Sequence, residues 1–271
     1  MAVALQRLYR SPIAAPMRPA LRRLHRSMLS PDHLRKAWRL IRILTIQYGY
    51  LRSVAAETPL DSQQAPLPWY TYPAVEYLKQ IDFHNKTVFE YGCGHSTLFW
   101  AERAARVVSV EHDASWYARV KPRLPATCEL RLETDPDAYA NAIRRSATPF
   151  DVIVIDGLVA GRTRLKCARA AVPMLRPGGM IVLDNSDWLP ESSRFLRESD
   201  LIEVDMTGFA PINDYTCTTS FYFDRNYRFA PLADRQPVAG VGAHAYNWES
   251  AAMAERIAAE RTRAGDGKQE A

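Results

Sequence analysis

The chain has 271 residues, of which 47% are hydrophobic, so it is long and apolar enough to bury a sizeable core. Its four cysteines lack paired or zinc-type spacing, which argues against a disulfide framework and a structural zinc site and is typical of a reducing compartment. The net charge of +5 is unevenly spread, because residues 1–52 hold 11 basic residues and one acid and the remainder is therefore mildly acidic.

Residues 1–67 are predicted to form a basic N-terminal arm. From His33 to about Arg52, apolar residues recur every three or four positions between arginines, which predicts an amphipathic helix. We favour packing of this helix on the domain with its arginines in water. Peripheral contact with an anionic membrane is the main alternative, and binding of nucleic acid is less favoured. The arginine-rich, acid-poor start is also typical of an organellar transit peptide.

Two further features bear on location and on the entry to the main domain. The chain shows no apolar run of about 20 residues and no signal-peptide pattern, so we expect a cytoplasmic protein, with membrane-peripheral attachment as the alternative. Residues 53–68 have the proline-rich composition of a linker. The aromatic segment 68–73 then leads into a predicted helix over 74–81.

Residues 88–97 form the most informative segment, with the sequence Val-Phe-Glu-Tyr-Gly-Cys-Gly-His-Ser-Thr. They predict a buried strand, a glycine turn and the start of a helix, where free backbone N–H groups can meet a ligand. The dinucleotide fingerprint fails because Thr97 occupies its third small position. Glu90 would repel a pyrophosphate and attract a cation.

More buried strands are predicted downstream, and each is followed by or ends in an acid. They cover residues 107–113, 130–135, 150–157 and 180–185, with a helix end and a turn over 175–179. A closing hairpin is predicted over residues 201–206 and 216–224, with a substrate-facing loop over 208–215. Residues 246–262 are predicted to be helical, and the tail from Ala264 disordered.

As a set, these elements resemble class I S-adenosylmethionine-dependent methyltransferases. The resemblance implies an α/β, Rossmann-like, doubly wound and mostly parallel seven-stranded sheet with a reversed final strand, plus an N-terminal helical extension. It also implies S-adenosylmethionine as the cofactor and a pre-strand segment that covers the pocket, with packing of the aromatic residues of that segment onto the sheet as the alternative. The predicted organisation is an arm over 1–67, a methyltransferase domain over 68–245, and a C-terminal helix with tail over 246–271.

The predicted cofactor contacts lie at the glycine turn and at the strand ends. Glu111 is placed to bind ribose hydroxyls, and Asp135 the adenine amine. The full set is Glu90, Gly92, Gly94, Ser96, Glu111, His112, Asp135 and Asp156.

Asp156 and Asp184 are the predicted catalytic residues, because they end neighbouring strands at the edge where ligands bind in such sheets. With Asn185 they form an oxygen set suited to Mg²⁺ or Ca²⁺, and their spacing resembles the metal site of catechol and caffeoyl-coenzyme-A O-methyltransferases. The catechol enzymes carry a lysine base shortly after the first aspartate; Val159 stands at that place here. Asp156 as a general base without metal therefore stays open.

The residues Arg162, Arg164 and Lys166 are predicted to form a cationic face for an acidic acceptor, with an ordinary solvated helix start as the alternative. Together these features predict methylation of a small-molecule or sugar acceptor, most simply on oxygen. The alternatives are a non-catalytic cofactor-binding or interaction protein, an aminopropyl transferase and a nicotinamide oxidoreductase. Fold alone does not choose among them.

Overall fold

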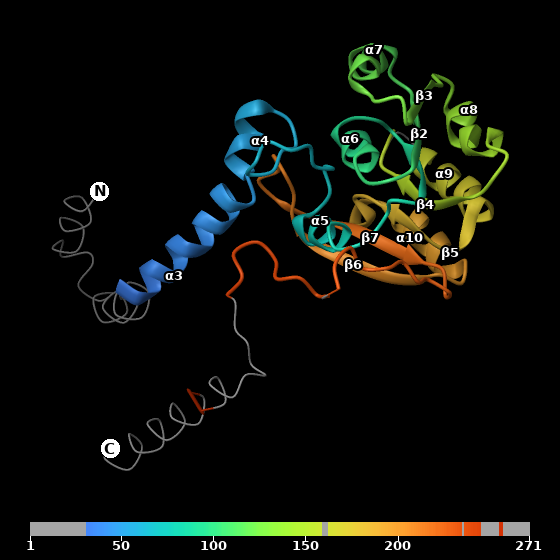
Figure 1. The fold of residues 1–271 in the computed structure, drawn as a ribbon. Helices are drawn as coiled ribbons and strands as arrows, with labels where there is room; N and C mark the ends of the chain where they lie inside the picture. The colour runs from blue at the N-terminus through green and yellow to red at the C-terminus, as the bar shows by residue number, and fades with distance from the viewer. Residues whose placement is uncertain (1–30, 159–161, 235, 245–254, 257–271) are drawn as a thin grey trace, which may run out of the picture.

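A seven-stranded sheet forms the centre of the protein (Figure 1). The computed structural model describes residues 31–158, 162–234, 236–244 and 255–256. The strand order is β3-β2-β1-β4-β5-β7-β6, with β7 antiparallel to both of its neighbours and the other pairings parallel. The strands are β1 (Thr87–Tyr91), β2 (Arg106–Glu111), β3 (Cys128–Leu132), β4 (Phe150–Ile155), β5 (Leu175–Leu183), β6 (Ile202–Phe209) and β7 (Thr216–Phe223). The predicted α/β class and the reversed final strand are confirmed.

The helices flank the sheet and connect its strands (Figure 1). The α-helices are α3 (Pro31–Arg42), α4 (Tyr50–Ala56), α5 (Tyr72–Leu78), α6 (His95–Ala101), α7 (Ala114–Val120), α8 (Pro136–Asn141), α9 (Thr163–Ala171) and α10 (Pro190–Glu198). The shorter turns are the π-helix η2 (Ile43–Gln47) and the 3₁₀ helices η3 (Lys121–Arg123), η4 (Ala142–Arg145), η5 (Val172–Met174) and η6 (Ser186–Trp188).

The hydrophobic core has two layers, one on each face of the sheet. Every residue of β4 is buried, as expected for a continuous apolar run in a parallel sheet. Because side chains alternate along a strand, Ile153 and Ile155 pack with α8, α9 and α10, whereas Val152 and Val154 pack with α5 and α6. Each such buried side chain contributes about 1.5–3 kcal/mol, so the sheet holds its strand ends in fixed positions.

The amphipathic helix predicted over 33–52 is interrupted. Gly49 has φ +81°, and a Cβ there would lie 2.4 Å from the backbone of Asp61, so the chain turns at a position that only glycine accommodates. The expectation that this helix packs on the domain is wrong for α3, which buries none of its residues. Near its C-terminal end Arg39 contacts His244, and aromatic packing begins beyond α3, where the ring centroids of Tyr48 and Tyr72 lie 4.4 Å apart.

Some strand boundaries also differ from prediction. β3 ends at Leu132, because Asp135 begins α8 instead of ending the strand. β5 begins at Leu175, where a helix end and turn were expected. The predicted turn is present as a shift of register within β5, because Phe150 pairs with Leu175 but Val152 pairs with Met180.

Two predictions fall largely outside the described residues. The helix over 246–262 is described only at residues 255–256, and the tail from 264 is not described. Of the predicted arm, the structure describes residues 31–67. Among the helices that the structure describes, none has the length and apolar character needed to cross a bilayer.

Candidate functional site

The turn after β1 lies against the end of β4. Gly92 has φ +99°, and a Cβ there would lie 2.8 Å from the backbone oxygen of Asp156, so only glycine allows this approach. The Gly94 N–H donates to Thr97 Oγ1 at 2.9 Å and closes the first turn of α6. As a result, residues 93–96 line a cavity.

Glu90 lies buried beneath this turn, with 1% of its surface exposed. Its Oε2 accepts hydrogen bonds from Thr97 Oγ1 at 2.5 Å and from Ser109 Oγ at 2.9 Å. Its Oε1 is buried without a hydrogen-bond partner among the described residues. Burial raises the pKa of Glu90 to about 7. Thr97, which breaks the dinucleotide fingerprint, therefore fixes the Glu90 carboxyl beneath the turn, and Glu90 itself is not among the residues that line the cavity.

Glu111 ends β2 and is held by backbone groups. Its Oε1 accepts hydrogen bonds from the N–H groups of His112 at 2.8 Å and Asp113 at 2.9 Å. His112 Nδ1 lies 2.9 Å from the same oxygen. These contacts fix the carboxylate at the strand end, where the ribose contact was predicted.

The residues after Glu111 position an aromatic ring over the glycine turn. Asp113 Oδ1 accepts from the N–H groups of Ser115 and Trp116, at 2.7 and 2.9 Å, and so caps α7. Trp116 Nε1 then donates to the Cys93 carbonyl oxygen at 2.7 Å. Trp116 thereby forms one wall of the cavity.

Asp135 has a structural task at the start of α8. Its Oδ1 accepts from the backbone N–H groups of Asp137 at 3.1 Å and Ala138 at 2.8 Å. Asp135 is not among the residues that line the cavity. Its contact with the adenine amine stays a prediction.

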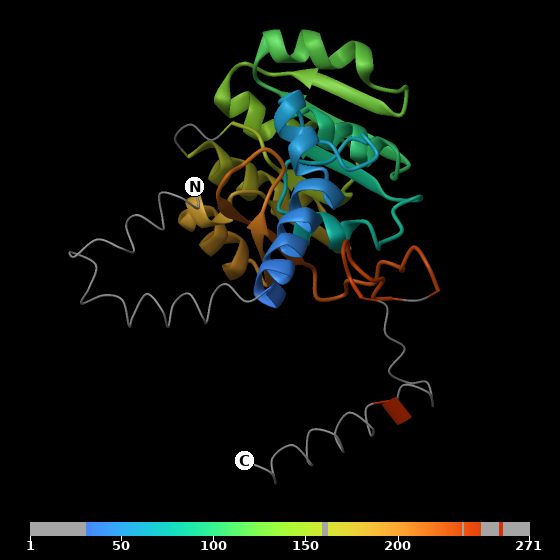
Figure 2. The ribbon, with the colours of Figure 1, turned by 90° about the vertical axis from the view of Figure 1, so that its left-hand side faces the viewer.

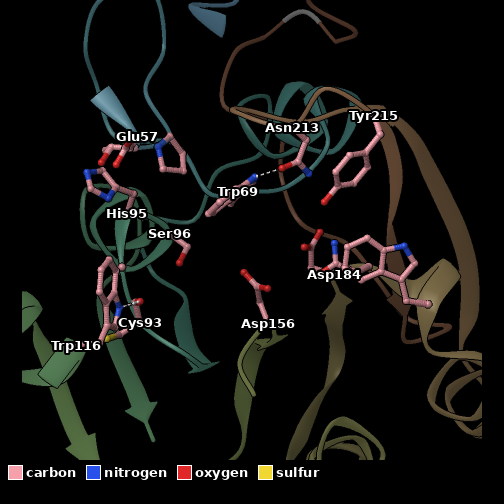
Figure 3. Close-up of a pocket in the computed structure, with 15 residues that line it drawn as sticks. Glu57, Trp69, Cys93, His95, Ser96, Trp116, Asp156, Asp184, Asn213 and Tyr215 are labelled. Carbon is pink, nitrogen blue, oxygen red and sulfur yellow. Dashed lines mark hydrogen bonds between the residues drawn. The ribbon is translucent and has the colours of Figure 1, made fainter. Parts of the chain in front are cut away.

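The cavity has a volume of about 370 Å³ and lies at the carboxyl ends of β1, β4 and β5 (Figure 3). In Figure 3 the Asp156 carboxylate points into it, between Ser96 and Asp184. The loop over 210–215 and the segment after α4 close other sides. The lining residues are Glu57, Thr58, Pro59, Trp69, Cys93, Gly94, His95, Ser96, Trp116, Asp156, Asp184, Asn185, Trp188, Asn213 and Tyr215.

The aromatic segment 68–73 forms part of the cavity wall, as the resemblance implied. Trp69 lines the cavity, and its Nε1 donates to Asn213 Oδ1 at 3.1 Å (Figure 3). Tyr70 is fully buried, and its hydroxyl has no partner among the described residues. Burial raises the pKa of Tyr70, and the nearby carboxylates of Glu90 and Asp156 raise it further.

A buried arginine joins the ends of β4 and β5. The Arg164 guanidinium donates to the backbone oxygens of Gly157 at 2.8 Å and Asp184 at 2.6 Å. It also lies 3.4 Å from Asp156 Oδ1 and 3.4 Å from Asn185 Oδ1. One cation therefore contacts the side-chain oxygens of Asp156 and Asn185 and the backbone oxygen of Asp184.

The two strand-end carboxyl groups have different surroundings. Burial raises the pKa of Asp156 to about 6, although the positive charge of Arg164 acts to lower it. Burial and the charge of Asp156 raise the pKa of Asp184 well above its ordinary value. Asp184 Oδ1 accepts from Thr219 Oγ1 at 2.6 Å. Asp156 is thus the member of the pair that ionises more readily.

The predicted cationic face is wrong, because its three members point to different partners. Arg162 pairs with Glu191 at 2.9 Å and Lys166 with Asp137 at 2.5 Å, and both pairs are exposed. Arg164 alone reaches the site. Spacing along α9 gave no signal that one of three neighbouring cations would be buried.

Comparison with known proteins supports the resemblance. Residues 89–186 match a family model described as a methyltransferase domain. The matched region runs from β1 to η6 and contains Glu90, the glycine turn, Glu111, Asp156 and Asp184. A search of curated proteins finds no match.

Many solved structures are similar in fold. One is a precorrin-6y C5,15-methyltransferase from Geobacter metallireducens, with 13% identity, a TM-score of 0.46, and coverage of 56% of this chain and 87% of that one. An rRNA methylase from Streptococcus thermophilus has 16% identity, a TM-score of 0.45, and coverage of 56% and 97%. The tomaymycin-synthesis O-methyltransferase from Streptomyces achromogenes, solved with S-adenosylmethionine, has 14% identity, a TM-score of 0.46, and coverage of 67% and 88%.

Proposed function

We propose that this S-adenosylmethionine-dependent methyltransferase methylates an oxygen atom of a small-molecule or sugar acceptor. The observation that carries the proposal is the Asp156 carboxylate, which points into the cavity beside Ser96 of the glycine turn (Figure 3). A carboxylate between the glycine turn, where the cofactor would bind, and the opposite wall, where the acceptor would bind, is placed to take a hydroxyl proton.

The residues present fit the cofactor. The unpaired buried Oε1 of Glu90 would accept from its amino group, and Glu111 would bind its ribose. S-adenosylmethionine supplies a methyl group activated by a sulfonium. The cavity is also lined by the exposed rings of Trp188 and Tyr215 and by the Asn213 amide. Such a lining suits an acceptor that has an apolar face and hydroxyl groups.

In the proposed reaction the acceptor hydroxyl gives its proton to the Asp156 carboxylate as the oxygen bonds to the methyl group. With a pKa of about 6, Asp156 is ionised at neutral pH and basic enough to share that proton. Asp184, held by Thr219, serves as a neutral hydrogen-bonding group. Orientation of the acceptor against the cofactor supplies the rest of the rate enhancement.

The predicted metal residues fit a divalent ion poorly. Within the described part of the chain no three His, Cys, Asp or Glu side chains gather into a metal-binding group, so the predicted site depends on the Asn185 amide. The Arg164 guanidinium lies 3.4 Å from Asp156 and from Asn185 and already supplies positive charge. A second cation there would be repelled. We therefore derive no step through Mg²⁺.

Chelation tests this point directly. Turnover in excess EDTA is expected to equal turnover without it, because Arg164 already supplies positive charge to Asp156 and Asn185. The measurement is an initial rate after gel filtration into EDTA, followed by addition of MgCl₂ as the control. A loss of rate that MgCl₂ restores would establish a metal at Asp156, Asp184 and Asn185.

The cofactor is tested by calorimetric titration with S-adenosylhomocysteine, with NAD as the comparator. Micromolar binding of S-adenosylhomocysteine alone is expected. Glu111→Ala should weaken it by more than about tenfold, since a charged hydrogen bond contributes about 1.5–3 kcal/mol. Glu102→Ala, an exposed change at the end of α6, is the matched control. Equal affinity for Glu111→Ala and wild type would remove the ribose assignment.

A further inference from the structure

Helix α3 exposes an apolar stripe to solvent. Leu34, Trp38 and Ile41 are 51%, 67% and 52% exposed, and Ala37 lies between them at helical spacing. Figure 1 shows α3 extending away from the sheet, and Figure 2 views the molecule from the side on which α3 lies. Near its C-terminal end α3 contacts the domain through Arg39 and His244. A helix of 12 residues is only marginally stable in water on propensity alone, and α3 buries none of its residues. Contact between its apolar stripe and another surface would supply the missing stabilisation.

A second stripe on the same helix is basic. Arg35, Arg39 and Arg42 recur at spacings of four and three, and Lys36 lies beside them, so positive charges flank the apolar stripe. The acid of this helix, Asp32, pairs with Arg35 at 2.7 Å and with Lys36 at 3.0 Å. The sequence ahead of α3 adds six arginines and no acid over residues 1–30. The partner surface should thus be both apolar and anionic.

We propose that α3 docks on a bilayer containing anionic lipids. The helix would lie parallel to the surface, with Leu34, Trp38 and Ile41 among the upper acyl chains and its basic residues on lipid phosphates. Tryptophan suits this boundary because its ring is apolar and its N–H is polar. A second copy of the chain fits less well, because two paired α3 helices would bring their basic stripes together. This inference is independent of the proposed methyl transfer.

The test is flotation of the full chain with vesicles. Vesicles of phosphatidylcholine alone are compared with vesicles of phosphatidylcholine and phosphatidylglycerol. The variants are Trp38→Glu/Ile41→Glu and Arg35→Glu/Lys36→Glu, and Leu232→Glu is the control because Leu232 is equally exposed, at 66%, but lies outside α3. Sedimentation velocity without vesicles records the oligomeric state of each protein.

Wild type and Leu232→Glu are expected to float with the mixed vesicles only, and less as NaCl is raised. Each α3 variant should lower the partition constant by roughly tenfold or more. Equal flotation of wild type and Trp38→Glu/Ile41→Glu would overturn the proposal, as would equal binding to neutral vesicles. A wild-type dimer that this variant dissociates, without vesicle binding, would assign the stripe to a second copy and also overturn it.

Discussion

Asp156→Asn is expected to lower kcat by about 10²–10⁴-fold, the usual contribution of a general base. The substitution keeps the size of the side chain and removes the carboxylate that points into the cavity. Its affinity for S-adenosylhomocysteine should stay within about tenfold of wild type, so that the loss is assigned to the chemical step. Steady-state kinetics and calorimetry on the same preparation measure both quantities.

The pH profile separates the two strand-end carboxyl groups. A base acts in its ionised form, so kcat/KM of wild type should fall as pH drops through about 6, the pKa to which burial raises Asp156. Asp184→Asn should cost less and keep this dependence, because the raised pKa of Asp184 already favours its neutral form. If Asp156→Asn retains both the rate and the acidic limb, another group is the base. Asp137→Asn, an exposed change on α8, is the control.

Arg164→Met is expected to lower the free energy of unfolding by about 3–5 kcal/mol, as when one partner of a buried ion pair is removed. The guanidinium is 5% exposed and donates to the backbone oxygens of Gly157 and Asp184 besides contacting Asp156. Removal leaves those groups buried without their donor. Urea denaturation at a fixed pH measures the change.

The loss should depend on pH and on which arginine is removed. At high pH Asp156 is ionised and most needs the cation; as pH falls below about 6 it becomes neutral, so the loss should shrink. Arg162→Met is the matched control, because Arg162 lies two residues away in an exposed pair and should contribute no more than about 1 kcal/mol. Arg164→Lys, which keeps charge but not the forked geometry, should fall between them. Equal stability of Arg164→Met and Arg162→Met would refute the buried role.

The features that could be predicted from the sequence are those that depend on local sequence patterns. Apolar runs and glycine turns predicted the sheet and placed Glu90, Asp156 and Asp184 at strand ends, because period and turn chemistry are local properties. The segments that carry Trp69 and Tyr215 were predicted to lie at the pocket, but Trp188 was missed, because its side chain reaches the cavity only after distant segments pack together. Proline content suggested a linker over 53–68, yet residues 57–59 line the cavity.

Charged side chains were the hardest to place from sequence. Composition treats Arg162 and Arg164 alike, and only the tertiary structure buries one and leaves the other in water. Asp135 is a second example. It was predicted to end a strand and contact adenine, and the structure shows that its side chain caps α8. Helix capping and ligand binding call for the same residue types, so sequence alone does not separate them.

The glycine turn carries a thiol at Cys93, directly in the cavity wall. Burial and the neighbouring carboxylate of Glu111 raise the pKa of this thiol far above its ordinary value. Oxidants and alkylating agents attack thiolates, so a thiol held in its protonated form reacts slowly with both. Burial first, and the Glu111 carboxylate second, therefore favour slow reaction of Cys93 with such reagents, which alkylation of the protein with iodoacetamide would measure.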